Sequence, residues 1–259
     1  RYSGKIAALR EHFSEYGLIR HRIRVELAWL CALADESGIT GIAPFPTAAR
    51  GEIEAVAATF GVADGERVKA IEAKTNHDVK AVEYWLKERF AHVPAVAAAT
   101  EFIHFACTSE DINNLSHALM LKSARDAVML PTLNVLITRL QKLAQQHANL
   151  AMLCRTHGQT ATPSTLGKEM AVFVHRLRRQ RKQFAEVEIL AKINGAVGNF
   201  NAHRIAYPNV NWQTFSDAFL KDLGLARRPA TTRTQPTDWT PEYFPALSPA
   251  PPTPGYFCR

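Results

Sequence analysis

Hydrophobic residues recur at helical spacing along most of this chain and rarely alternate with polar ones as they would in a strand. The longest pattern covers residues 166–191, where seam positions follow one another by four and three without a slip. This regularity is typical of long packed helices and predicts an all-α protein with a long-helix bundle. The seam consists of Leu166, Met170, Phe173, Leu177, Gln180, Phe184, Val187 and Ala191.

Shorter patterns predict further helices before this seam. They cover residues 5–34, 48–60, about 64–75, 78–90 and about 112–147, with possible breaks at Gly17 and Gly38. Pro131 is expected to kink or split the last of them. Residues 98–107 are apolar enough to be buried. For the seam helix, Thr162 is a candidate N-cap and Pro163 a candidate first residue, which would hold His157 in a short rigid loop near a helix start.

The last part of the chain differs in composition. Eight of its 14 prolines lie after Leu225, and the stretch from Pro249 to Pro254 cannot be helix interior. We therefore expect a smaller N-terminal helical domain over residues 1–97, a partial and incomplete central bundle over 98–225, and a poorly folded or aberrant tail over 226–259.

The composition indicates the cellular compartment and the kinds of site to expect. The 259 residues are 47% hydrophobic and 21% charged, no apolar run is long enough for a membrane helix, and no secretory signal is recognisable. The cysteines form no C-x-x-C pair, so we expect a soluble cytoplasmic protein without a metal site or disulfide scaffold. The chain begins with Arg1 rather than Met, which suggests that its true start is missing.

A formal charge of +7 suits nucleic acid, a membrane surface or a polyanionic small molecule. The basic cluster of residues 176–182 falls off the apolar seam, and no recognition-helix unit accompanies it. We interpret the cluster as a solvated face and expect neither a nucleic-acid nor a membrane partner.

Three polar clusters stand at predicted helix boundaries: Asn76–Asp78, Thr108–Asp111 and the loop around His157. Helix starts offer free N–H groups to anions, and histidine exchanges protons near neutrality. Each cluster also has a plainer interpretation: Thr108 and Asp111 have capping-box spacing, Asp78 or His77 can cap the helix that follows, and His157 can be an ordinary surface histidine. Together the clusters favour a helical enzyme that acts on a small anion.

At these residues the chain resembles the bacterial type of adenylosuccinate lyases, within the fumarase and aspartase superfamily. The likeness covers about residues 1–225, with its motifs in the same order. The matching segments are Thr75–Tyr84, Phe102–Asn114, Arg155–Gln159, Asn194–Asn199 and Asn201–His203.

The resemblance implies β-elimination of fumarate from adenylosuccinate, which gives AMP, and from the succinyl-carboxamide ribonucleotide of purine biosynthesis. It implies no cofactor and a homotetramer that shares a central bundle and builds each active site from several subunits. It also implies site residues. His157 would be the general acid, His77 would help to bind and orient, and the remaining substrate contacts would be Arg1, Tyr2, Asn76, Asp78, Thr108 and Ser109.

The resemblance has gaps. The family's base resembles a serine on a mobile Gly-Ser-Ser-x-Met-Pro-x-Lys-x-Asn-Pro loop, a motif that these residues do not contain. Thr160 stands where the family usually has proline, and Arg233 where a substrate-binding glutamine is expected. We therefore expect a fragment that is inactive by itself. Three alternatives stay open: a sister lyase acting on argininosuccinate or aspartate, a non-catalytic helical scaffold, and a basic nucleic-acid binder.

Overall fold

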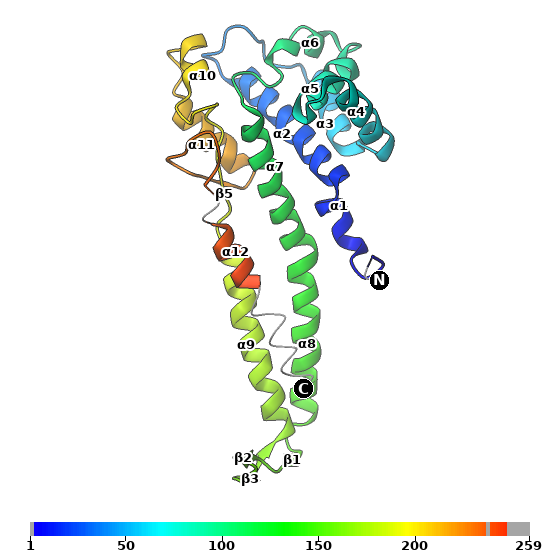
Figure 1. The fold of residues 1–259 in the computed structure, drawn as a ribbon, viewed down its shortest axis with the longest axis vertical. Helices are drawn as coiled ribbons and strands as arrows, with labels where there is room; N and C mark the ends of the chain where they lie inside the picture. Colours follow the sequence, from blue (N-terminus) through cyan, green and yellow to red (C-terminus); the bar gives the residue numbers. More distant parts are fainter. Residues whose placement is uncertain (1–2, 237–238, 248–259) are drawn as a thin grey trace. The chain divides into compact units, whose positions relative to one another are not determined.

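The computed structural model describes residues 3–236 and 239–247, the last three of these by their backbone alone (Figure 1). Contacts divide the described chain into two compact units. The first unit contains residues 3–122 and 189–236, and the second contains residues 123–188 and 239–247. Helices dominate both units, so the all-α prediction is confirmed.

The first unit opens with three consecutive helical segments: η1 (Ala7–Leu9), α1 (Arg10–Phe13) and α2 (Glu15–Asp35). The break lies at Ser14, whose hydroxyl accepts a hydrogen bond from the Gly17 N–H at 3.1 Å, and not at Gly17 as expected. A Cβ on Gly17 would lie 2.6 Å from the Glu11 carbonyl oxygen, so glycine permits the close approach of α1. More than half of α2 is buried, and Val25, Trp29 and Leu30 are each 0% exposed.

Four helices follow α2, and three of them were predicted closely. They are α3 (Thr47–Thr59), α4 (Val62–Thr75), α5 (Asp78–Phe90) and the short α6 (Pro94–Ala97). The predicted stripe of α5 is buried, from Val79 to Phe90. The expected burial of residues 98–107 was wrong for most positions, because only Ala99 and Ile103 are fully buried around the 3-10 turn η2 (Thr100–Phe102).

The helix expected to contain Pro131 changes character just before that residue. Helix α7 (Ser109–Ala124) is followed by the π-helical segment η3 (Arg125–Met129) and then by α8 (Leu130–Gln146). Proline has no N–H to donate and crowds the preceding turn, so the wider π segment accommodates it. The expected kink or split takes the form of a π segment within a helix that continues, because Ala124 and Leu130 on either side of it keep right-handed helical dihedral angles.

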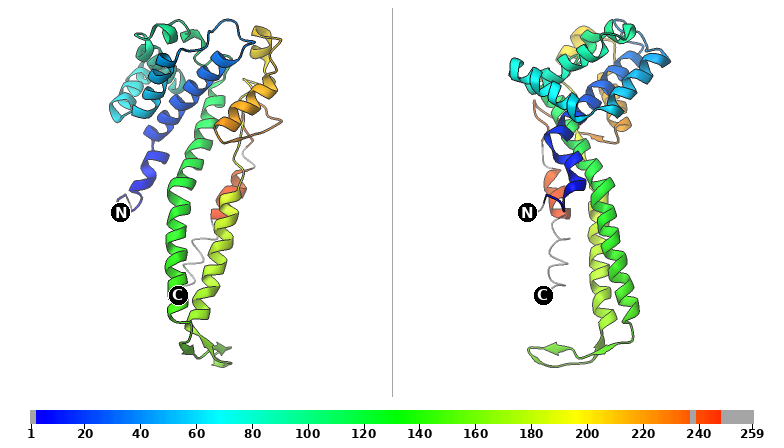
Figure 2. Two further views of the ribbon diagram at one scale, coloured as in Figure 1. Left: turned by 180° about the vertical axis from the view of Figure 1, so that it is seen from behind. Right: turned by 90° about the vertical axis from the view of Figure 1, so that its right-hand side faces the viewer.

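In the second unit α8 packs against α9 (Leu166–Glu186), and Figure 2 shows the two running side by side with a β-structured connection at one end. Ile137, Leu140, Val174 and Leu177 form their core. The connection contains β1 (Ala151–Met152) paired with β4 (Ser164–Thr165), and β2 (Arg155–Thr156) paired with β3 (Gln159–Thr160).

Both predicted ends of the seam helix were wrong. The backbone stays extended through β4, so the N-cap is Thr165, whose hydroxyl accepts from the Lys168 N–H at 3.2 Å, and not Thr162. At the other end α9 stops at Glu186, and Ala191 lies in β5 (Leu190–Ala191) of the first unit. The basic side chains of residues 176–182 are largely solvated, as expected. Four of the five are exposed and Arg181 is half-buried; the exposed ones are Arg176, Arg178, Arg179 and Lys182.

Strand β5 pairs in parallel with β6 (Ala226–Arg227), and α10 (Asn201–Ala206) and α11 (Trp212–Asp222) lie between them in sequence. Aromatic rings from α2, α10 and α11 pack together around Trp29, which lies 5.1 Å from Phe219 and 6.1 Å from His203 between ring centroids. Within the first unit, this cluster joins residues 189–236 to residues 3–122.

The described part of the proline-rich tail contains β6 and α12 (Thr240–Leu247). Tyr243 of α12 is 0% exposed and packs its ring edge-on against Phe184 at 5.0 Å, within the second unit. The run from Pro249 to Pro254 lies outside the described residues, and the domain boundaries drawn from the sequence stay a prediction. Within the described ranges, no helix combines the length and apolarity that crossing a bilayer requires.

Candidate active site

A sharp turn between α4 and α5 carries the first polar cluster. Asn76 ends α4 in the left-handed region, with φ +53° and ψ +30°, and its N–H donates to the Glu72 carbonyl at 2.8 Å. Asparagine tolerates this conformation better than most residues. The chain then enters α5 through His77, which is extended and acts as the N-cap. Of the two caps that the sequence allows, Asp78 and His77, the structure uses His77.

The hydrogen bonds of His77 fix which ring nitrogen carries the proton. The Lys80 N–H donates to His77 Nδ1 at 3.1 Å, so Nδ1 is the bare nitrogen and the proton of the neutral ring sits on Nε2. His77 Nε2 lies 3.4 Å from Ser109 Oγ, a long contact, and the His77 side chain is 49% exposed. In this state His77 offers an N–H donor at Nε2, next to the Ser109 hydroxyl.

Ser109 is the first residue of α7, and its neighbours form one half of the capping box that the spacing suggested, while the Asp111 N–H donates to the Thr108 backbone carbonyl at 2.9 Å. The Thr108 N–H donates to Asp111 Oδ2 at 2.9 Å. Asp111 is fully buried, so this bond is shielded from water. The start of α7 is the positive end of the helix, where the Thr108 and Ser109 hydroxyls can serve an anion.

The carboxylate of Asp78 is already engaged. It lies 2.5 Å from the Arg22 guanidinium and accepts the Val79 N–H at 2.9 Å. Partial burial acts to raise the pKa of Asp78, but the Arg22 charge and the backbone donor outweigh it, so the pKa lies below its usual value. An open hollow adjoins this turn and is lined by Lys69, Glu72, Ala73, Asn76, His77 and Asp78.

His157 lies in the second unit, at the tip of the β2–β3 hairpin, and not next to a helix start. It is exposed, with φ +50°, and Gly158 follows it with φ +76°. The Arg155 guanidinium donates to the Gly158 carbonyl at 3.3 Å across the turn. The hairpin thus presents the imidazole to solvent within its own unit.

The structure brings His77 and Ser109 together, and with them the adjoining Asn76, Asp78 and Thr108. His157 belongs to the other unit and is described there alone. Arg1 and Tyr2 lie outside the described residues. No cluster of three or more His, Cys, Asp or Glu side chains is arranged to hold a metal ion in the part of the chain that the structure describes.

Sequence reasoning missed two buried cations in the first unit. Arg22 comes from α2 and pairs with Asp78 beside the site, and Lys192 pairs with Asp111 under the start of α7 at 3.0 Å. Neither stands in a recognisable spacing with its partner, since 56 and 81 residues separate the pairs in sequence. A charged residue among apolar helix positions was the available signal for Arg22, which lies one position before Ile23 in the buried stretch of α2.

A sequence profile of a protein family described as "Lyase" matches residues 1–249, and the chain belongs to this family. The fold likeness agrees. A fumarate lyase from Mesorhizobium sp. BNC1 superposes with a TM-score of 0.75 at 22% identity, covering 97% of this chain and 55% of that chain. A 3-carboxy-cis,cis-muconate lactonizing enzyme from Pseudomonas putida gives 0.73 at 26% identity, covering 97% and 54%.

The sequence relatives are more specific. The chain is 54% identical over 244 residues to the adenylosuccinate lyase of Escherichia coli strain K12, covering 94% of this chain and 54% of that protein. The identity is 52% with the adenylosuccinate lyase of Haemophilus influenzae, covering 95% and 54%, and 46% with that of Legionella pneumophila strain Corby, covering 92% and 52%. The resemblance stated from the motifs is confirmed. The chain spans about half the length of these curated relatives.

Proposed function

We propose that this chain supplies part of an adenylosuccinate lyase, which removes fumarate from adenylosuccinate to leave AMP and acts likewise on the succinyl-carboxamide ribonucleotide. The names of the relatives support this reading, and so does the residue chemistry of the first unit. The observation that carries the proposal is the pairing of the His77 Nε2–H with the Ser109 hydroxyl at the start of α7, which forms a donor-rich site for an anion.

The reaction breaks a carbon–nitrogen bond. A base removes the proton next to a carboxylate, donors stabilise the negative charge that develops, and an acid protonates the departing nitrogen. We assign the donors to Thr108, Ser109 and His77, and the acid to His157. Asn76, Asp78, Arg1 and Tyr2 would complete the substrate contacts.

No residue of this chain is assigned as the base. We propose that the base comes from outside these 259 residues, and that the isolated chain turns over slowly or not at all. The absorbance change on adenylosuccinate cleavage measures this directly. Turnover by the purified chain at the rate of a full-length relative would refute this part of the proposal.

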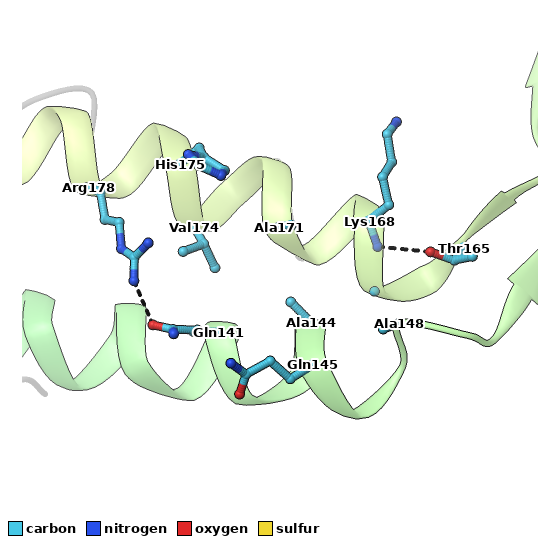
Figure 3. Close-up of a pocket in the computed structure, with 11 residues that line it drawn as sticks. Gln141, Ala144, Gln145, Ala148, Thr165, Lys168, Ala171, Val174, His175 and Arg178 are labelled. Atoms are coloured by element: carbon cyan, nitrogen blue, oxygen red, sulfur yellow. Dashed lines mark hydrogen bonds between the residues drawn. The ribbon is translucent and has the colours of Figure 1, made fainter.

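We further propose that the chain assembles with copies of itself or with full-length subunits, in the homotetramer that the resemblance implies. Exposed apolar side chains on the α8–α9 pair support this: Val135 is 54% exposed, Val172 41% and Leu143 38%. A groove between the two helices adds a surface of small residues, Ala144, Ala148 and Ala171, bordered by a hydrogen bond of 2.7 Å from Arg178 to Gln141 (Figure 3). Sedimentation of the purified chain measures the assembly.

The nearest rival is a sister lyase that acts on argininosuccinate or aspartate. Calorimetric titration with AMP and with arginine separates the two, since our proposal expects AMP to bind and arginine not to. We also propose the cytoplasm as the setting, which suits the free thiols of Cys31, Cys107 and Cys154.

A further inference from the structure

One buried arginine contacts both helices that carry the site of the first unit. The side chain of Arg22 on α2 is 7% exposed. Its terminal Nη2 lies 2.5 Å from Asp78 Oδ2, and its Nε donates to Asn113 Oδ1 at 2.9 Å. Asp78 adjoins His77 at the start of α5, and Asn113 lies one turn after Ser109 on α7. A single guanidinium therefore links the two elements that present His77 and Ser109.

We propose that Arg22 is a positioning residue that sets the spacing and the ring tautomer of His77 opposite Ser109, and so governs how tightly this site holds an anionic ligand. The ligand part of this inference rests on the proposed function. The positioning part rests only on contacts within the first unit.

An arginine is suited to this task. Its planar guanidinium offers donors in fixed directions, so one face can serve Asp78 while the Nε–H serves Asn113. The stem is anchored because Ile23 and Val25 beside it on α2 are at most 1% exposed. A lysine at this position would keep the charge but could not hold both partners in one rigid geometry.

The contact also decides which hydrogen bonds are open to His77. Asp78 Oδ1 lies 3.7 Å from His77 Nδ1. After a small rotation of the Asp78 side chain, the carboxylate could accept a hydrogen bond from a protonated Nδ1. Arg22 holds the other carboxylate oxygen, and the Val79 N–H holds Oδ1. Asp78 therefore stays away from the ring, Nδ1 accepts from the Lys80 N–H, and the proton stays on Nε2, facing Ser109.

Without Arg22 the Asp78 carboxylate keeps only the Val79 N–H as a partner, and its freed Oδ2 can compete with the Lys80 N–H for His77 Nδ1. The ring proton then moves from Nε2 to Nδ1, and Nε2 changes from a donor into an acceptor. An acceptor facing the site repels a carboxylate or phosphate oxygen, so the loss of Arg22 should weaken anion binding.

The test uses two substitutions at Arg22 and one matched control. Arg22→Met removes the charge and replaces it with an apolar side chain of similar length, and Arg22→Lys keeps the charge. Arg24→Met is the control, because Arg24 is exposed two residues further along the same helix. Nitrogen-15 NMR of the labelled full chain, with the His77 signals identified by their loss in His77→Gln, reports the tautomer.

We expect the Nε2–H tautomer in the unsubstituted chain and in Arg24→Met, together with a nuclear Overhauser contact between the His77 ring and the Ser109 methylene. Both Arg22 variants should lose the contact and shift toward the Nδ1–H form. An unchanged tautomer and contact in Arg22→Lys would overturn the proposal, and this variant decides it alone if Arg22→Met does not fold.

Titration with adenylosuccinate provides the second readout. Both Arg22 variants should bind about tenfold more weakly than the unsubstituted chain and Arg24→Met, and equal affinity would overturn the link to ligand binding. If the unsubstituted chain bound no adenylosuccinate, the proposed function would lose its support, while the tautomer would still decide the role of Arg22.

Discussion

The Lys192 ammonium lies 3.0 Å from the Asp111 carboxylate, and both side chains are 0% exposed. Asp111 also accepts the Asn194 N–H and the Gly195 N–H, each at 3.1 Å. Lys192 in turn donates to the Gly195 carbonyl at 2.9 Å. This buried network joins the start of α7 to the chain just after β5, so the frame of the Thr108–Ser109 cluster includes residues more than 80 positions away in sequence.

Replacing Lys192 by Met should destabilise the chain strongly. The substitution leaves the Asp111 carboxylate buried without its counter-charge, and breaking a buried pair in this way costs about 3–5 kcal/mol. Urea unfolding followed by circular dichroism measures the change. Lys182→Met is the control, because that side chain is 74% exposed and its loss should change the free energy of unfolding by less than about 0.5 kcal/mol. Similar unfolding midpoints for the two variants would contradict the prediction.

His203 should make the first unit sensitive to acid. It is 0% exposed, and neither ring nitrogen has a hydrogen-bond partner among the described residues. Burial lowers the pKa of His203 from 6.5 to about 4. Because the unfolded chain takes up the proton first, the stability linked to His203 is complete above pH 6.5 and falls as the pH drops from 6.5 to 4, by about 3 kcal/mol in all.

The variant His203→Phe should lose this part of the pH dependence. Its free energy of unfolding, measured between pH 4 and 7, should fall less steeply than that of the unsubstituted chain. The other histidines contribute to both proteins alike, so the difference between the two curves isolates His203. His92→Phe, at an exposed position, should follow the unsubstituted curve. Parallel curves for His203→Phe and the unsubstituted chain would show that His203 is not the titrating group.

Alanine substitutions at two glycines with positive φ should distinguish the cost of a steric clash from the cost of backbone strain. A Cβ on Gly198, at φ +81°, would lie 2.3 Å from the Thr231 carbonyl oxygen, whereas one on Gly158, at φ +76°, would meet nothing within 4 Å. Gly158→Ala should therefore cost only the left-handed strain of about 1–2 kcal/mol. Gly198→Ala should cost more, because Thr231 must also move. Thermal unfolding compares them, and equal losses would mean that residues near Thr231 do not pack against Gly198.

The helices of the first unit could be predicted from the sequence because their signals are local. Apolar spacing and breakers define α3, α4 and α5, and in the second unit the missing N–H of Pro131 accounts for the π segment η3. The ends of the seam helix could not be predicted in this way. Pairing of residues 151–152 with 164–165 holds the backbone extended up to Thr165, and this pairing between separate segments leaves no local mark at Thr162 or Pro163.

The candidate site likewise contains residues with a local sequence signal and residues that are defined by remote contacts. His77, Ser109 and the capping role of Asp111 follow from residue types at helix boundaries, which are visible in the sequence. Arg22 and Lys192 do not, since each is defined by a partner on a remote helix. The sequence allows either Asp78 or His77 to cap α5, and the choice depends on a remote contact: Asp78 is occupied by Arg22, so His77 accepts the Lys80 N–H.

Replacing His157 by Gln should leave the free energy of unfolding nearly unchanged while lowering the rate of the reaction. The residue is exposed at the tip of the β2–β3 hairpin, so we expect the free energy of unfolding to change by less than about 0.5 kcal/mol. If His157 is the general acid, however, the leaving nitrogen loses its proton donor, and removal of such a group costs about 10²–10⁴ in rate. The two measurements together distinguish an exposed catalytic histidine from an ordinary surface histidine.

The rate is measured by mixing, because this chain carries no assigned base. The partner is a full-length adenylosuccinate lyase whose matching histidine has been replaced by glutamine, so that by our proposal it keeps its base but lacks the acid. If each site is built from several subunits, as the resemblance implies, the unsubstituted chain should restore cleavage by contributing His157, and the His157→Gln chain should not. Equal restoration by both chains would remove His157 from the mechanism, because the activity would then come from groups that the two chains share.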